Sequence, residues 1–84
     1  MTYQCLILED EPIARDILKA YISQVPTIEL SASCQNAFEA TEVLNSQKID
    51  LIFLDIHLPK LSGLNFIKTL PNAPKIIITT AYKE

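Results

Sequence analysis

Four short segments of the chain have the hydrophobic pattern of β-strands. Three are nearly unbroken apolar runs rich in β-branched and aromatic residues: YQCLIL (3–8), LIFL (51–54) and KIIIT (75–79). Such runs are typical of strands buried on both faces of a parallel sheet. The fourth segment, IELSASC (28–34), alternates apolar with polar residues. This alternation predicts a strand with one less buried face, at an edge of the sheet.

Helical periodicity follows the first strand. Residues 12–24 begin with proline, which is tolerated at the first position of a helix. The apolar residues of this segment recur at the spacing of one helical stripe, which is the usual core-facing pattern. They are Ile13, Ile17, Leu18, Tyr21 and Ile22.

Two further helices are predicted after the second and third strands. Residues 36–47 begin with Asn36, a candidate N-cap, and Glu39 follows three residues later in a variant of the capping box. This helix should bury Ala40, Val43 and Leu44. A shorter helix over residues 63–70 is ended by Pro71 and Pro74.

Strands and helices therefore alternate along one domain. This order predicts an α/β fold with a parallel sheet and helices on both faces. At 84 residues, the chain is of marginal size for a core that stands alone. There are no internal repeats and no long linker.

Composition excludes several classes of protein. The net charge is −3 and no Lys/Arg run occurs, which argues against nucleic acid as a direct partner of this segment. No apolar stretch approaches the roughly 20 residues that span a bilayer, and the N-terminus does not resemble a signal peptide. Cys5 and Cys34 lack metal-binding spacing, so we expect two reduced, buried thiols in a cytoplasmic protein.

Acidic residues follow the predicted strands. The first strand is followed by Glu9 and Asp10, the third by Asp55, while the fourth ends at Thr79 and Thr80. Ligands of open parallel sheets bind at the carboxyl ends of the strands, where these side chains should meet. Clustered carboxylates repel one another unless a cation lies between them. The cluster therefore predicts a hard divalent metal, with Mg²⁺ the natural candidate.

Simpler roles are open for each acid taken singly. An acid after a buried strand often caps a helix or lies in a solvated loop, and Glu11 before Pro12 fits that role. His57 lies two residues beyond Asp55, where its imidazole can simply face solvent. Its backbone carbonyl is then the better candidate for a ligand.

Three motifs together resemble a known family. LILEDEP, LIFLDIHLPKLSG and IIITTAY, in this order and spacing, are similar to the receiver domain of two-component response regulators. The segments DIHLPKLSGL and TTAYKE are most similar to the LytT/AlgR type of regulator. The resemblance covers the whole chain. It implies a flavodoxin-like, doubly wound, three-layer α/β/α fold with sheet order 2-1-3-4, the fifth strand being missing.

The resemblance implies a role for each site residue. Asp55 matches the phosphoacceptor, which takes a phosphoryl group from a histidine kinase. Asp10 matches a direct Mg²⁺ ligand, Glu9 a neighbour that acts through water, and His57 a backbone-carbonyl ligand. Thr80 matches the switch hydroxyl. Pro59 and Gly63 match the turn after the acceptor strand, and Tyr82 a position that tunes access of water.

The chain also departs from the family pattern. A full receiver is expected to continue with a fourth helix, a fifth strand ending in lysine and a fifth helix, so residues 1–84 would be its N-terminal part. We expect KIIIT to form a bare edge strand, which favours strand pairing in a homodimer or oligomer, or partial disorder.

Two function classes result. The first is a phosphoacceptor domain, not an enzyme, that switches a C-terminal DNA-binding output domain outside this chain. The alternative is a truncated or degenerate receiver that acts as a dimerisation or interaction module without phosphorylation. An aspartate-nucleophile phosphatase would need an acid at position 57, where histidine stands.

Overall fold

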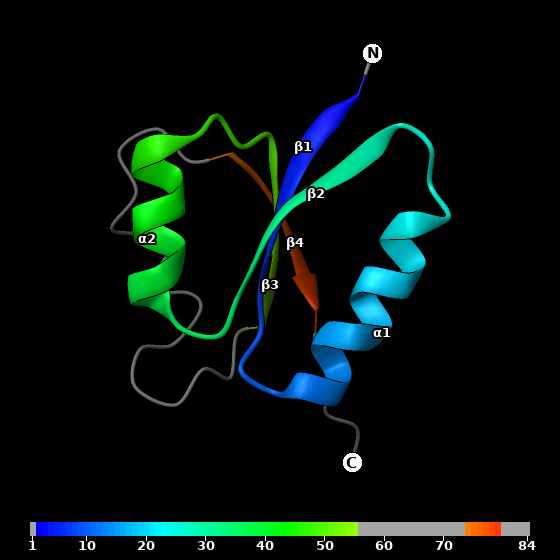
Figure 1. Ribbon diagram of the computed structural model, residues 1–84, viewed down its shortest axis with the longest axis horizontal. Coiled ribbons are helices and arrows are strands. Elements are labelled where there is room, and N and C mark those ends of the chain that lie inside the picture. Colours follow the sequence, from blue (N-terminus) through cyan, green and yellow to red (C-terminus); the bar gives the residue numbers. More distant parts are fainter. Residues whose placement is uncertain (1, 56–73, 80–84) are drawn as a thin grey trace.

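The computed structural model describes residues 2–55 and 74–79. In chain order these residues form β1 (Tyr3–Leu8), α1 (Pro12–Ser23), β2 (Ile28–Cys34), α2 (Ala37–Ser46), β3 (Leu51–Asp55) and β4 (Lys75–Thr79) (Figure 1). The strand and helix boundaries agree with the predicted segments to within a residue or two. The helix predicted over residues 63–70 lies outside the described residues.

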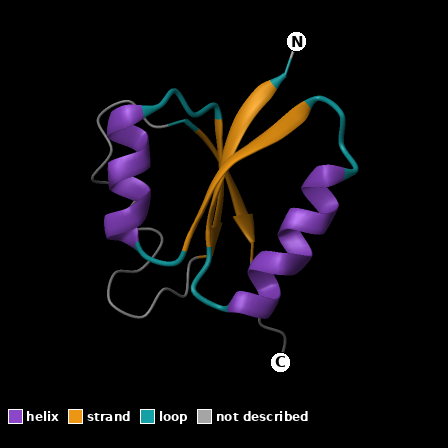
Figure 2. Cartoon of the chain, in the orientation of Figure 1, coloured by secondary structure: helices purple, strands orange, loops and turns teal. Residues whose placement is uncertain are grey.

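The strands form one parallel sheet in the order β2-β1-β3-β4. The two helices lie on opposite sides of this sheet, α2 on one and α1 on the other (Figure 2). The predicted strand order and the three-layer α/β/α arrangement are therefore confirmed. β1 and β3 occupy the centre of the described sheet, and β2 lies at an edge as the alternating pattern predicted.

A bulge in β2 moves its apolar residues from one face of the sheet to the other. Cys5 pairs with Leu30 and the next residue, Leu6, pairs with Ala32, so Ser31 is the extra residue on β2. Because neighbouring residues of β1 point to opposite faces, the shift of one residue moves the apolar stripe of β2 from one face to the other. Leu30 packs on the α1 side, whereas Ala32 packs on the α2 side. The prediction of one less buried face is therefore wrong for β2 as a whole.

The core has two parts, one on each face of the sheet. On the α2 side a cluster of buried residues consists of Leu6, Leu8, Cys34, Ala40, Ile49, Ile52 and Leu54. On the α1 side the buried cluster is smaller and consists of Cys5, Ile7 and Ile22. The predicted stripe of α1 is buried in part: Ile22 is 4% exposed, but Ile13 and Tyr21 are 70% and 66% exposed.

The two helices begin in different ways. The Asn36 side chain accepts a hydrogen bond of 2.9 Å from the Glu39 N–H, so the predicted N-cap of α2 is confirmed. The Glu39 carboxylate accepts a bond of 3.0 Å from the Gln35 N–H, one residue earlier than in a standard capping box. Helix α1 instead begins with Pro12, and Glu11 at its N-cap makes no capping hydrogen bond through its side chain. Neither described helix is long and apolar enough to cross a bilayer.

Candidate functional site

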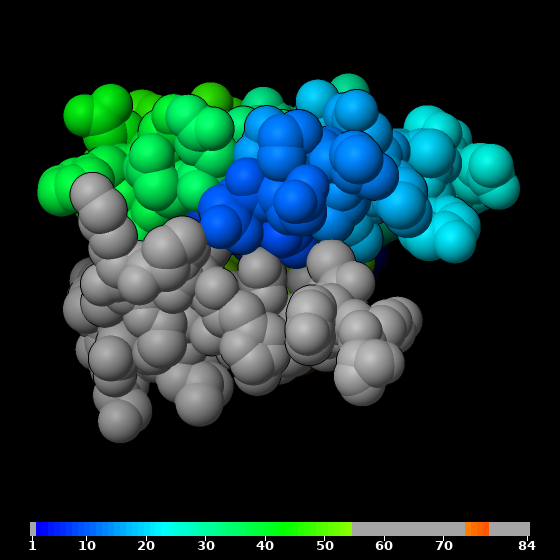
Figure 3. Space-filling view, turned by 90° about the horizontal axis from the view of Figure 1, so that it is seen from below, coloured from blue at the N-terminus to red at the C-terminus, as the bar shows by residue number. Residues whose placement is uncertain are grey.

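The register of the sheet brings three strand ends to one edge. Leu8 of β1 pairs with Leu54 of β3, so the following residues Glu9 and Asp55 lie at the same level on neighbouring strands. Asp55 in turn pairs with Thr79 of β4. Figure 3 views the molecule from this carboxyl edge, where the segment after β1, in blue, lies at the surface between α2 and α1. The predicted meeting of β1, β3 and β4 at one edge is thus present in the backbone.

Among the described residues at this edge, Glu9 is the most buried charged one. It is 1% exposed, and its Oε2 accepts a hydrogen bond of 3.3 Å from the Glu11 N–H. Burying a carboxylate is costly unless hydrogen bonds or a cation compensate the charge. Asp10, the next residue, is half-buried in the same loop. The loop after β1 therefore places two acidic residues next to the end of β3.

These residues suit a hard cation in their chemistry. The predicted set, made of the carboxylates of Glu9, Asp10 and Asp55 with the His57 carbonyl, offers only oxygen atoms, as Mg²⁺ prefers. Among the described residues, no group of three or more His, Cys, Asp or Glu side chains converges on one point. The Asp55 side chain and all of His57 and Thr80 lie outside the described part, so their roles stay predictions. The same holds for Pro59, Gly63 and Tyr82.

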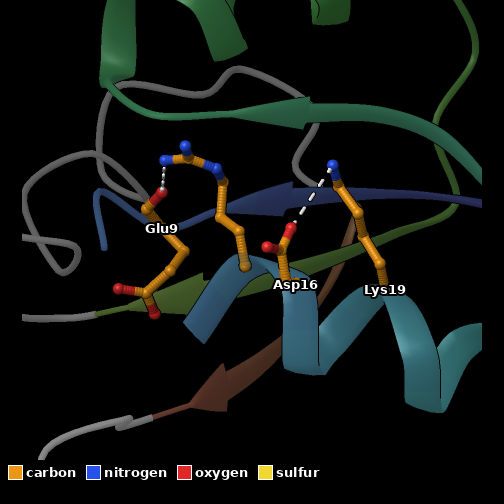
Figure 4. Close-up of polar contacts among 4 residues, drawn as sticks. Glu9, Asp16 and Lys19 are labelled. Atoms are coloured by element: carbon orange, nitrogen blue, oxygen red, sulfur yellow. Dashed lines mark hydrogen bonds and ion pairs between the residues drawn. The ribbon is translucent and has the colours of Figure 1, made fainter. Parts of the chain in front are cut away.

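The backbone of Glu9 is held from both sides. Its N–H donates to the carbonyl of Cys34 at the end of β2, at 3.0 Å. Its carbonyl accepts a hydrogen bond of 2.9 Å from Nη1 of Arg15, which lies one turn into α1. Figure 4 shows this bond as a dashed line, with the Glu9 carboxylate directed away from the guanidinium. The end of β1 is therefore tied to both β2 and α1.

Sequence reasoning missed Arg15. Its contact with Glu9 spans six residues of the chain and joins a strand end to a helix, so no periodicity of strand or helix reveals it. One signal was available, because Arg15 is the only arginine in the chain and follows the acidic loop by one helical turn. A lone arginine beside clustered acids is a candidate for charge-assisted hydrogen bonding.

Both cysteines are free and buried, as predicted. They lie on opposite faces of the sheet, Cys5 on the α1 side and Cys34 on the α2 side. Burial raises the pKa of the Cys5 thiol above its usual value. Burial, and to a lesser degree the negative charge of Glu39, raises the pKa of Cys34 to about 11. Both thiols thus stay protonated and unreactive near neutral pH.

The chain matches known proteins over nearly its whole length. Residues 5–84 match the family profile described as the response regulator receiver domain. An uncharacterized response regulatory protein of Shewanella oneidensis is 42% identical over 82 residues, which are 95% of this chain and 35% of that protein. The sensory transduction protein LytT of Enterococcus faecalis is 40% identical over 82 residues, with 94% of this chain and 34% of that protein covered. The chain thus spans about a third of the length of these relatives.

Solved structures give the same comparison in three dimensions. The MaeR response regulator bound to beryllium trifluoride has a TM-score of 0.87 and 31% identity, with 100% of this chain and 70% of that chain covered. The response regulatory domain of protein mrkE from Klebsiella pneumoniae has a TM-score of 0.80 and 32% identity, with 96% and 69% covered. Both likenesses extend across nearly all of the present chain.

Proposed function

Because the chain belongs to the response regulator receiver domains, we propose that Asp55 accepts a phosphoryl group from a histidine kinase. One observation supports this above the others: the register of β1 and β3 sets Asp55 level with the buried Glu9, at the carboxyl edge of the sheet. Asp55 is thereby the strand-end acid with acidic neighbours, which is where a metal-assisted phosphoryl transfer would take place.

The transfer is a single displacement. A carboxylate oxygen of Asp55 attacks the phosphorus of the phosphohistidine, a P–O bond forms, the P–N bond breaks and the imidazole leaves. Little covalent work falls to the protein, so its contribution is to position the groups and to compensate charge. Mg²⁺, held by Asp10 and Asp55 directly, by Glu9 through water and by the carbonyl of His57, would neutralise phosphate oxygens when bound. Thr80 then donates its hydroxyl hydrogen to a phosphoryl oxygen and so reports the modification to the rest of the domain.

The activity of the whole protein is part of the same proposal. The structurally similar MaeR response regulator was solved bound to beryllium trifluoride, which supports a phosphorylation site in this chain. BtsR of Escherichia coli, which is 36% identical over 81 residues, is a transcriptional regulatory protein, and this supports a role in transcription for the whole protein. We assign this chain to the N-terminal part of a cytoplasmic receiver domain that is a signalling module and not an enzyme. In this proposal the DNA-binding step would belong to an output domain outside residues 1–84.

The test is Mg²⁺-dependent labelling with acetyl phosphate, applied to the 84-residue chain and to a longer chain that contains it. The unsubstituted protein should be labelled, and Asp55→Asn should not. Asp16→Asn, which changes an exposed acid of α1, is the control and should be labelled like the unsubstituted protein. Chelation of Mg²⁺ should abolish the label. Absence of label from both the short and the longer chain would overturn the assignment of Asp55 as phosphoacceptor.

One observation favours the second candidate function, a phosphorylation-independent interaction module. In the described part of the sheet β4 pairs only with β3, and its Ile77 is 41% exposed. An edge strand with an exposed apolar residue can pair with another chain. Sedimentation should then reveal a dimer or larger strand-paired oligomer whose formation is independent of Mg²⁺ and acetyl phosphate.

A further inference from the structure

The contact between Arg15 and the backbone of Glu9 has a consequence for metal binding. Strand β1 ends at Leu8, so the Glu9 carbonyl lies beyond the strand, at the start of the loop that carries Asp10. The guanidinium of Arg15 holds this carbonyl at 2.9 Å. We propose that Arg15 is a positioning residue, which fixes the acidic loop so that Glu9 and Asp10 bind Mg²⁺. This inference rests on the metal site of the proposed function.

The loop between β1 and α1 is short and tied at several points. The Glu9 N–H bonds to β2, the Glu9 carbonyl bonds to the Arg15 side chain, and the Arg15 N–H donates to the Glu11 carbonyl at 2.9 Å. The Glu11 N–H returns to the carboxylate of Glu9. Of these bonds, the one from Arg15 ties the Glu9 carbonyl to α1, and loss of the guanidinium removes it. The peptide that joins Glu9 to Asp10 then loses its tie to α1, so the backbone that carries both carboxylates is held less firmly.

The charge of Arg15 makes the proposal easy to separate from a simple electrostatic effect. A positive charge near the acidic edge repels a bound cation, so its removal alone should strengthen Mg²⁺ binding. Its guanidinium, however, donates to a backbone carbonyl, and the Glu9 carboxylate is directed away from it (Figure 4). A positioning role predicts the opposite sign, because a loosened ligand set binds the metal more weakly.

The experiment measures Mg²⁺ affinity by calorimetric titration of the unphosphorylated protein, with amide hydrogen exchange at Glu9 and Glu11 as a second readout. We expect Arg15→Ala to weaken Mg²⁺ binding roughly tenfold, the size usual for loss of a residue that orients metal ligands, and to speed exchange at both amides. Arg15→Lys should recover part of the affinity, since an ammonium group can also donate to the carbonyl.

Lys19→Ala is the matched control. It removes the same charge from the same helix, but Lys19 forms its ion pair with the exposed Asp16, at 3.9 Å. Figure 4 shows this pair apart from the bond of Arg15 to Glu9. It should change Mg²⁺ affinity by less than about twofold. If Arg15→Ala does not fold, Arg15→Met keeps the aliphatic stem and replaces it in the comparison.

Each outcome bears on the proposal. Affinity in Arg15→Ala that equals or exceeds that of the parent chain would overturn the positioning role and leave the proposed function untouched. Failure of the parent chain itself to bind Mg²⁺ would overturn both. Normal Mg²⁺ binding without acetyl phosphate labelling would count against the phosphoacceptor role alone.

Discussion

The sheet face under α2 and the sheet face under α1 are built from the same strands, yet they are packed differently. Among the described residues, seven are buried in the cluster on the α2 side and three in the cluster on the α1 side. Half-buried apolar residues pack against both clusters, but on the α1 side the large residues Ile17 of α1 and Ile77, which pairs with Phe53, are exposed.

This difference shows that an apolar pattern predicts a face more reliably than it predicts burial. Ile52 and Phe53 are neighbours on β3, but Ile52 is 0% exposed under α2, whereas Phe53 on the other face is half-buried. The stripe of α1 has the right spacing for a core helix, and its residues Ile13, Ile17 and Tyr21 still face solvent to half or more of their surface. Burial depends on the neighbouring element, which a local pattern does not contain.

The largest expected effect comes from replacing isoleucine by alanine on each face. Ile52→Ala removes a side chain that is 0% exposed and should lower the free energy of unfolding by about 2–5 kcal/mol, because it leaves a cavity in a packed core. Ile77→Ala is the matched variant on the next strand, where the side chain is 41% exposed, and should cost less than about 1 kcal/mol. Urea denaturation measures both. Equal losses would contradict the contrast between the two faces.

A smaller effect is expected at the helix starts. Asn36→Ala removes the side chain that accepts the Glu39 N–H and should destabilise the chain by about 1 kcal/mol. Glu11→Ala at the corresponding position of α1 removes no capping bond of the side chain and should change stability by less than about 0.5 kcal/mol. Thermal denaturation of the two variants in the absence of divalent ions makes the comparison. A loss in Glu11→Ala as large as that in Asn36→Ala would contradict this difference between the two helix starts.

The smallest effect is confined to alkaline solution. The pKa of the Cys34 thiol is raised from 9.0 to about 11 in the folded chain, so the unfolded chain loses this proton first as the pH rises. The associated stability is complete below pH 9 and is lost as the pH passes through 11. Urea denaturation from pH 8.5 to 11 should therefore show a decline that is shallower in Cys34→Ala.

Cys5→Ala is the comparison on the opposite face. Burial alone raises the pKa of Cys5, without the added charge of Glu39, so its removal should reduce the alkaline decline less. An alkaline decline of the same slope in Cys34→Ala and the parent chain would show that the Cys34 thiol does not contribute to it.

The fold was largely predictable because its signals are local. The runs at 3–8 and 75–79 have the composition of buried parallel strands. The alternation at 28–34 predicted an edge strand, and β2 lies at an edge of the sheet. The N-cap role of Asn36 could be predicted because its hydrogen-bond partner, Glu39, lies only three residues away. The bulge at Ser31 could not be predicted, since the apolar alternation continues through it without a break.

The candidate site likewise has residues that the sequence predicts and one, Arg15, that it does not. Glu9, Asp10 and Asp55 could be placed at one edge from strand ends and the rule for parallel sheets, and the register of β1 and β3 agrees with that placement. The part played by Arg15 depends on where α1 lies over the end of β1, which is a tertiary relation. Thr80 and His57 remain predictions from the resemblance.

The extra residue in β2 bears on how the chain can change in length. Within residues 2–55 and 74–79, β2 pairs with β1 alone, so an added residue disturbs a single ladder of backbone hydrogen bonds. The same insertion in β1 would shift its pairing with β2 on one side and β3 on the other, and would displace Glu9 from the level of Asp55. Insertions and deletions that arise during evolution should therefore be tolerated in β2 and eliminated from β1.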